Sequence, residues 1–170
     1  MSDQYPPQNP YGQQPTPTGP GGEPPLWAPY YGISFGGAIS RFFKKYATFS
    51  GRASRSEFWW WYLANVIVAF VLSIIAVIGV VTSDIQVDSS TGQTTGSFSG
   101  LYWIAVVISI LWGLAVLVPS LALGWRRLHD ANLSGALWII AIFVNIVGLV
   151  FGLLPSNPAG ARFERPERGR

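Results

Sequence analysis

FWWWYLANVIVAFVLSIIAVIGVV, residues Phe58 to Val81, is an apolar stretch of the chain without a single charged residue. At about 1.5 Å of rise per residue, a helix of this length covers the roughly 30 Å hydrocarbon core of a membrane. Because lipid offers no hydrogen-bond partners to the backbone, a segment that crosses it as a single stretch must be helical. The stretch therefore predicts a transmembrane helix.

Two further uncharged stretches follow it. One runs from about Leu101 to Gly124, and the other from about Ala136 to Leu154, where Pro155 closes it. The third is the shortest, but it is still long enough to cross. Together the three stretches predict an all-α membrane protein with three transmembrane helices.

The overall composition agrees with a surface that faces lipid. Charged residues make up 11% of the 170 residues, against about 25% in soluble domains. The chain has no cysteine and one histidine. Disulfides, thiolate metal sites and a cysteine nucleophile are therefore excluded. We predict no cofactor, no metal ligand and no catalytic residue.

The chain divides into four predicted segments. Residues 1–31 are rich in Pro, Gln and Gly without apolar periodicity, which predicts a disordered tail. Residues 32–57 predict an interfacial segment, with an amphipathic helix over about Ile33 to Phe49 that carries Arg41, Lys44 and Lys45. Residues 58–155 are the predicted three-helix transmembrane domain, and residues 156–170 form an arginine-rich C-terminal tail.

The basic residues predict an orientation. Lys and Arg precede the first span and occupy the second connector, at Arg126 and Arg127, whereas the polar loop over 82–100 has none. The positive-inside rule therefore places the N-terminus and the second connector in the cytoplasm. Three crossings would put the arginine-rich C-terminal tail outside, which we expect. The alternative is a re-entrant third segment that returns the tail to the cytoplasm.

Two charged motifs adjoin the spans, both on the predicted cytoplasmic side. The first is GRASRSEFW, Gly51 to Trp59, and the second is RRLHD, Arg126 to Asp130, followed by Ser134-Gly135. A weaker C-terminal element contains Gly160, Arg162, Phe163 and Pro166. On these motifs, over about residues 42–166, the chain resembles the bacterial inner-membrane proteins of domain of unknown function 805. The resemblance implies a polytopic inner-membrane protein and no established activity.

The motifs have two physical readings. In the first they are structural: arginines anchor the topology, Ser54 or Ser56 caps the first span, and Arg126 pairs with Asp130 at i, i+4. In the second they converge on an anionic lipid headgroup or a partner. A catalytic His129–Asp130 dyad is disfavoured, because neighbours on a helix point about 100° apart. The candidate headgroup or partner site consists of Arg52, Arg55, Glu57, Arg126, Arg127, His129 and Asp130.

Small residues mark one face of the third span. Asn145, Gly148 and Gly152 share that face and predict a helix-contact stripe. Packing within the chain and dimerisation through the stripe are equally compatible with the pattern.

These observations favour a non-enzymatic scaffold or accessory protein of the bacterial cytoplasmic membrane. Its expected partners are anionic membrane lipids, a second copy or another membrane protein, and not nucleic acid. The alternative is a small oligomeric transporter or channel. The absence of charged residues within the spans counts against that alternative, because transporters usually carry one there. A membrane enzyme that acts on lipids comes third.

Overall fold

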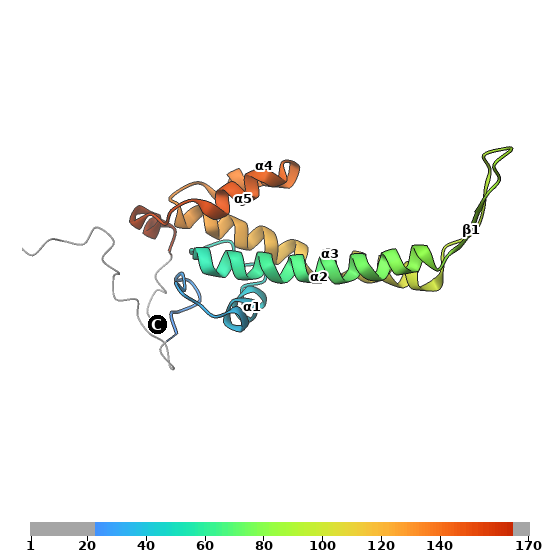
Figure 1. The fold of residues 1–170 in the computed structure, drawn as a ribbon. Coiled ribbons are helices and arrows are strands. Elements are labelled where there is room, and N and C mark those ends of the chain that lie inside the picture. The colour runs from blue at the N-terminus through green and yellow to red at the C-terminus, as the bar shows by residue number, and fades with distance from the viewer. Residues whose placement is uncertain (1–22, 165–170) are drawn as a thin grey trace, which may run out of the picture.

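The computed structural model describes residues 23–164, which form a mostly helical molecule with one small sheet. Two long helices form most of the length of the molecule, and the shorter helices gather around one end of them (Figure 1). In chain order the elements are α1 (Phe35–Lys44), α2 (Arg55–Val81), β1 (Asp84–Val87), β2 (Thr94–Ser97), α3 (Gly100–Asp130), the 3-10 helix η1 (Gly135–Leu137), α4 (Trp138–Phe143), α5 (Asn145–Leu153) and the 3-10 helix η2 (Pro158–Phe163).

α2 and α3 lie side by side as an antiparallel pair. α2 begins at a capping box: the Ser54 hydroxyl accepts from the Glu57 amide at 3.1 Å, and the Glu57 carboxylate accepts from the Ser54 amide at 2.7 Å. At the far end Gly79 allows close approach, since a Cβ there would lie 2.5 Å from the Tyr102 nitrogen. Among the described residues, these two helices are the ones long and apolar enough to cross a membrane, which confirms that the first two predicted spans are helices of sufficient length.

The polar loop between them is a β-hairpin rather than irregular chain. β1 and β2 pair antiparallel, with Asp84 opposite Ser97 and Val87 opposite Thr94. The hairpin extends from the far end of the helix pair (Figure 1). The all-α prediction therefore misses a small sheet, which the β-branched residues of both strands favour.

The third predicted span is not confirmed as one helix. Its residues form two short helices that break at Val144, whose backbone has φ −129° and ψ 88°. α4 has 6 residues and α5 has 9, so they rise about 9 Å and about 14 Å, well short of a roughly 30 Å hydrocarbon core. The two lie beside each other (Figure 1).

Because α5 folds back along α4, the following residues return to the end where α2 begins. The Asn157 amide donates to the Asp130 carbonyl at 2.7 Å, and the Gly51 amide donates to the Phe163 carbonyl at 3.1 Å. The expected placement of the C-terminal region at the opposite end is therefore wrong for residues up to 164. The return of the chain to this end is the one that the alternative predicts.

α1 packs against the first turns of α2. Its Phe42 ring stacks on Trp61, with centroids 3.4 Å apart, and Ala38 is buried beside it. Residues 24–31, which belong to the predicted disordered tail, are ordered against α1, with the Arg41 guanidinium donating to the carbonyls of Pro24, Pro25 and Ala28. The rest of that prediction, residues 1–22, lies outside the described residues.

Candidate functional site

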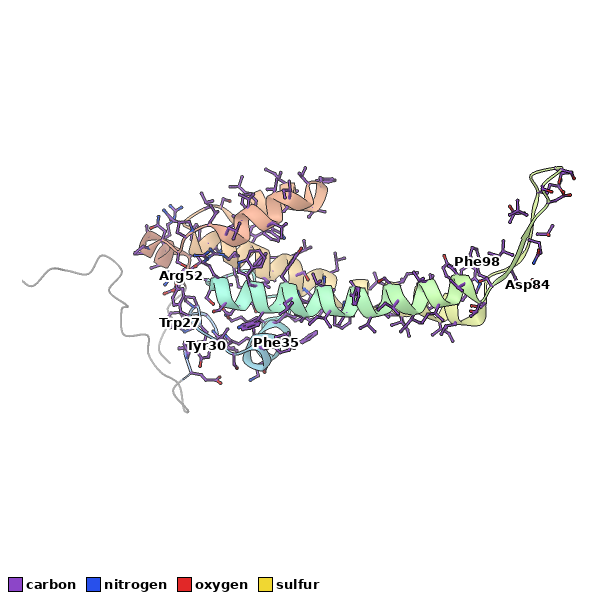
Figure 2. All side chains as sticks on the ribbon, viewed as in Figure 1. Trp27, Tyr30, Phe35, Arg52, Asp84 and Phe98 are labelled. Carbon is purple, nitrogen blue, oxygen red and sulfur yellow. The ribbon has the colours of Figure 1, made fainter. Side chains whose placement is uncertain are left out.

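The two charged motifs meet at one end of the α2–α3 pair. GRASRSEFW precedes and begins α2, and RRLHD ends α3, so the antiparallel pairing brings them together. The Ala53 amide donates to the Arg126 carbonyl at 3.1 Å and joins the two motifs directly. Arg52 lies at this end and Asp84 at the other (Figure 2). The charged side chains form two buried groups, which we call the Asp130 cluster and the Glu57 cluster.

The Asp130 cluster surrounds a fully buried carboxylate. Oδ2 is 2.7 Å from Arg127 Nη1 and accepts from the Ser156 hydroxyl, while Oδ1 accepts from the Tyr31 hydroxyl at 2.9 Å. Arg52 Nη1 lies 3.7 Å from Oδ1. Three hydrogen-bond donors thus contact this carboxylate, and the Arg52 guanidinium lies close enough for a charge interaction. The cluster consists of Tyr31, Arg52, Arg127, Asp130, Ser156 and Glu164.

Arg127 fastens the returning C-terminal region to α3. Besides Asp130, its guanidinium donates to the carbonyls of Gly152, at 3.4 Å, and Leu154. These carbonyls belong to the C-terminal end of α5, where the last turn of a helix lacks internal partners and carries partial negative charge. Arg127 is therefore the counter-charge of Asp130 and also supplies side-chain donors to the carbonyls at the C-terminal end of α5.

Tyr31 reaches the same carboxylate from the N-terminal segment. Burial, reinforced by the charge of Asp130, raises the pKa of Tyr31 to about 12. Its hydroxyl therefore stays protonated at neutral pH and remains a donor. One carboxylate thus gathers the N-terminal segment, α3 and the C-terminal region.

The edge of this cluster is closed by Arg52, His129 and Phe163. Arg52 pairs with Glu164. The His129 ring stacks flat on Phe163, with centroids 4.0 Å apart, and its Nδ1 lies 3.1 Å from the Gly51 carbonyl oxygen. A Cβ at Gly160 would overlap the His129 carbonyl oxygen, so the close packing of η2 on α3 requires glycine there.

The Glu57 cluster lies where α1 meets the ends of α2 and α3. Glu57 Oε1 is 2.9 Å from Arg41 Nε and 3.7 Å from Lys45 Nζ. Oε2 accepts from the amides of Ser54, at 2.7 Å, and Tyr30, at 3.3 Å. Arg126 of α3 is also buried, with Nε donating to the Ala122 carbonyl at 3.1 Å. The cluster comprises Arg41, Lys45, Glu57 and Arg126.

Lys45 has an unusual environment for an amine. Burial lowers its pKa to about 7, despite the nearby Glu57 carboxylate, which acts in the opposite direction. The positive charges of Arg126 and Arg41 lower it further. Its side chain is 1% exposed. The charge state of this amine therefore changes near neutral pH.

The comparisons with known proteins bear on this arrangement. The family model described as "Protein of unknown function (DUF805)" matches residues 46–165, which include both motifs and the C-terminal region. The chain belongs to this family. The DUF805 match leaves out α1 and the N-terminal segment, which contribute Tyr31, Arg41 and Lys45 to the two clusters.

Two curated relatives have names that specify a membrane but no activity. The chain is 35% identical to inner membrane protein YhaI of Escherichia coli strain K12 over 105 residues, which is 62% of this chain and 70% of the relative. It is 29% identical to inner membrane protein YhaH of the same strain over 124 residues, which is 71% of this chain and 87% of the relative. No solved structure matches the chain.

The charged residues of the DUF805 motifs have other partners than the sequence predicts. Arg126 does not pair with Asp130: the partner of Asp130 is Arg127 at i, i+3, and Arg126 turns into the Glu57 cluster. Of the two predicted capping residues, Ser54 and Ser56, Ser54 is the one that caps α2. Arg55 is exposed at the start of α2.

Sequence reasoning missed several members of the clusters. Arg41 and Lys45 were assigned to a headgroup-facing surface, and Tyr31, Ser156 and Glu164 were not singled out. One signal was present: Ala38, Arg41, Phe42 and Lys45 follow the i, i+3, i+4, i+7 spacing of one helix face, and this is the buried face of α1 and its C-cap.

Two glycines of the predicted contact stripe pack within the chain. A Cβ at Gly152 would overlap the Phe58 ring, and a Cβ at Gly148 would lie 3.5 Å from Ala141 Cβ. Asn145 is the first residue of α5. Gly152 thus lets α5 approach α2, while Gly148 faces α4 with room for a methyl group.

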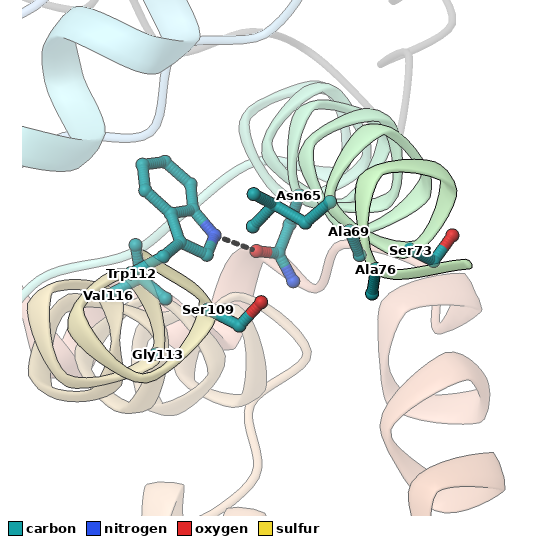
Figure 3. Close-up of a pocket in the computed structure, with 9 residues that line it drawn as sticks. Asn65, Ala69, Ser73, Ala76, Ser109, Trp112, Gly113 and Val116 are labelled. Carbon is teal, nitrogen blue, oxygen red and sulfur yellow. Dashed lines mark hydrogen bonds between the residues drawn. The ribbon is translucent and has the colours of Figure 1, made fainter. Parts of the chain in front are cut away.

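The described residues contain no group of three or more His, Cys, Asp or Glu side chains that could hold a metal ion. They do contain a groove of about 350 Å³ between α2 and α3. In it the Trp112 indole donates to the Asn65 carbonyl oxygen at 3.0 Å (Figure 3). The remaining lining comprises Ala69, Leu72, Ser73, Ala76, Ser109, Gly113 and Val116.

Proposed function

We propose that this chain is a non-enzymatic accessory or scaffold protein of the bacterial inner membrane, whose clustered end contacts anionic lipid headgroups on the cytoplasmic side. One observation carries the proposal. The charged motif residues in the two clusters mostly bind one another and the backbone inside the fold, which suits a stable platform better than an open reaction site.

The same end carries the cations that would meet the headgroups. Lys44 at the end of α1, Arg55 at the start of α2 and Arg162 in η2 are exposed. Basic residues near a membrane surface gain about 1 kcal/mol each from anionic lipids. Three of them at one end provide a modest attraction that depends on lipid charge.

The distribution of Lys and Arg also bears on the orientation of the chain in the membrane. Lys and Arg gather at the clustered end, whereas residues 82–100 at the hairpin end have none, which supports a cytoplasmic clustered end. The inner-membrane relatives support the compartment. The two long helices then cross the membrane, and the short α4–α5 hairpin enters it from the cytoplasmic side and returns.

The test is retention of lipid by the purified full chain. We expect native mass spectrometry to detect phosphatidylglycerol bound in preference to phosphatidylcholine, and the variant Lys44→Gln/Arg55→Gln/Arg162→Gln to lose about tenfold of that preference. The charge-conserving variant Lys44→Arg/Arg55→Lys/Arg162→Lys is the matched control and should retain it. Unchanged preference in the glutamine variant would contradict the headgroup contact, and turnover of the bound lipid would contradict the non-enzymatic role.

The groove between α2 and α3 favours a second candidate, a small transporter or channel that becomes complete as an oligomer. Asn65, Ser73 and Ser109 place polar atoms within the two candidate spans, and polar residues inside a membrane often mark a pathway. Solute or ion flux in proteoliposomes would support this candidate if it were lost on Asn65→Leu. Absence of flux from the oligomeric protein would leave the accessory role.

A further inference from the structure

The two clusters differ in their balance of charge. In the Asp130 cluster, two arginines face two carboxylates, those of Asp130 and Glu164. In the Glu57 cluster, the described charged groups are three cations, Arg41, Lys45 and Arg126, and one carboxylate. Buried charges are costly unless they are paired. The Glu57 cluster therefore has excess positive charge that no described side chain offsets.

Glu57 cannot satisfy all three cations. Arg41 and the amides of Ser54 and Tyr30 occupy its two oxygens at hydrogen-bonding distance. Lys45 Nζ remains at 3.7 Å, beyond the range of a hydrogen bond. The carboxylate is therefore already committed before Lys45 and Arg126 are considered.

Two donors of the cluster are buried and have no hydrogen-bond partner among the described residues: Lys45 Nζ and Arg126 Nη2. Each residue is 1% exposed. Charged donors left without an acceptor in a protein interior are rare and need an explanation. Here two such donors, both on basic side chains, lie on neighbouring elements. We therefore expect a negatively charged acceptor between them.

The surroundings limit the size of that acceptor. α1 covers the cluster, with Phe42 stacked on Trp61, and Ala53 beside them is fully buried. Because the two donors are closed off from the surface, a lipid headgroup cannot reach them without displacing α1. The acceptor must therefore be small.

We propose that the Glu57 cluster is an internal binding site for one small inorganic anion of about the size of chloride, held between Lys45 Nζ and Arg126 Nη2. The anion neutralises part of the excess charge and locks α1 onto the ends of α2 and α3. This site is separate from the exposed cations that contact headgroups in the proposed function, and neither depends on the other.

The test measures the thermal unfolding midpoint of the purified full chain in a non-ionic detergent at a pH below the Lys45 pKa of about 7. Sodium chloride is compared with sodium gluconate at equal ionic strength, because gluconate is too large for the site. A ligand that binds only the folded state stabilises it, so we expect chloride to raise the midpoint by about 5 °C, with saturation.

Three variants locate the effect. Lys45→Met and Arg126→Met should lose the chloride-specific rise, since each removes one of the two donors. Lys44→Met removes the same charge from the neighbouring, exposed position and should keep the rise. A wild-type chain without a chloride-specific rise, or a Lys45→Met chain that keeps it, would overturn the proposal.

A measurement on the wild-type chain alone covers the case in which these variants do not fold. The charged groups that face Lys45 are Arg41 on α1, Glu57 on α2 and Arg126 on α3. As pH rises through about 7 the Lys45 amine becomes neutral, so the chloride-specific rise should shrink several-fold. A rise that stays constant across this range would place the anion elsewhere and overturn the site.

Discussion

The partners of Asp130 come from segments far apart in the chain. Tyr31 comes from the N-terminal segment, Arg52 from the loop before α2, Arg127 from α3 and Ser156 from the residues after α5. A single buried carboxylate thus links four segments of the chain, in addition to the hydrophobic core around Phe42, Phe58 and Trp61. This arrangement is stable only while all partners are present, because a half-satisfied buried network is costly.

The first prediction follows from that requirement. Asp130→Asn keeps the shape of the side chain but leaves the buried Arg127 without its counter-charge, and presents an amide group to donors. Removing one member of a buried ion pair costs about 3–5 kcal/mol, so we expect a loss of that size in the free energy of unfolding, measured by denaturant titration in detergent micelles.

The matched control for Asp130→Asn is Asp84→Asn in β1, where the carboxylate is exposed. Surface changes of this kind stay within about 0.5 kcal/mol. Equal stability of the two variants would show that the Asp130 cluster does not hold the fold together.

At the residue scale, sequence predicted which charges gather at one end but not how they pair. One motif begins the first long helix and the other ends the second. Two such helices in succession run antiparallel, so this arrangement alone brings the motifs together. The partner of Asp130 depends on which face of α3 turns toward the returning C-terminal region. With that region predicted at the opposite end, the sequence offers Arg126 at i, i+4 as the partner of Asp130 and gives no reason to bring Ser156 and Glu164 near it.

At the scale of elements, α2 and α3 were predictable because their signal is local: a long uncharged window requires a helix in lipid. The α4–α5 hairpin is also encoded by a long uncharged window, but its residues form two short helices and not one long helix. Residues 136–154 are uncharged, with Asn145 as the one polar residue among them, and the break at Val144, just before Asn145, comes without proline or glycine at that position. Hydropathy does not register a turn that is held by contacts made elsewhere, such as Arg127 on the carbonyls of Gly152 and Leu154.

The second prediction separates the two glycines of α5. Gly152→Ala would place a methyl group against the buried Phe58 ring and force α5 away from α2. Overpacking of this kind costs about 1–3 kcal/mol, and we expect a corresponding fall in the unfolding midpoint.

Gly148→Ala is the control, since its methyl group meets Ala141 Cβ at an ordinary 3.5 Å. Alanine is the better helix former by about 1 kcal/mol, so this variant should be neutral or slightly stabilised. Equal destabilisation of both variants would mean that α5 does not pack on α2 as described.

At the scale of the whole molecule, the two ends of the α2–α3 pair have opposite character. One end is a closed assembly of N-terminal segment, α1, both motifs and η2, and the other is a narrow hairpin whose β1 and β2 side chains are largely exposed. The faces of α2 and α3 between them expose large apolar side chains along most of their length, among them Phe70, Val77, Leu111 and Leu114. A surface of this kind is typical of a face that contacts lipid, so we expect the helix pair to cross the membrane and the two ends to meet water.

The third prediction tests this architecture through the side of the membrane on which each end lies. The chain has no cysteine, so a single introduced thiol reports its own position without background. Ala159→Cys suits the C-terminal region, because Ala159 is exposed, whereas Ser156 is needed by Asp130. Ser97→Cys in β2 and Ser50→Cys before α2 mark the two ends of the helix pair, and both positions are exposed.

In intact cells an impermeant maleimide should label Ser97→Cys alone, and Ala159→Cys and Ser50→Cys should react only after the membrane is opened. A third full crossing would instead make Ala159→Cys react from outside together with Ser97→Cys, and would rule out the re-entrant α4–α5 hairpin together with the clusters that depend on the return of the chain.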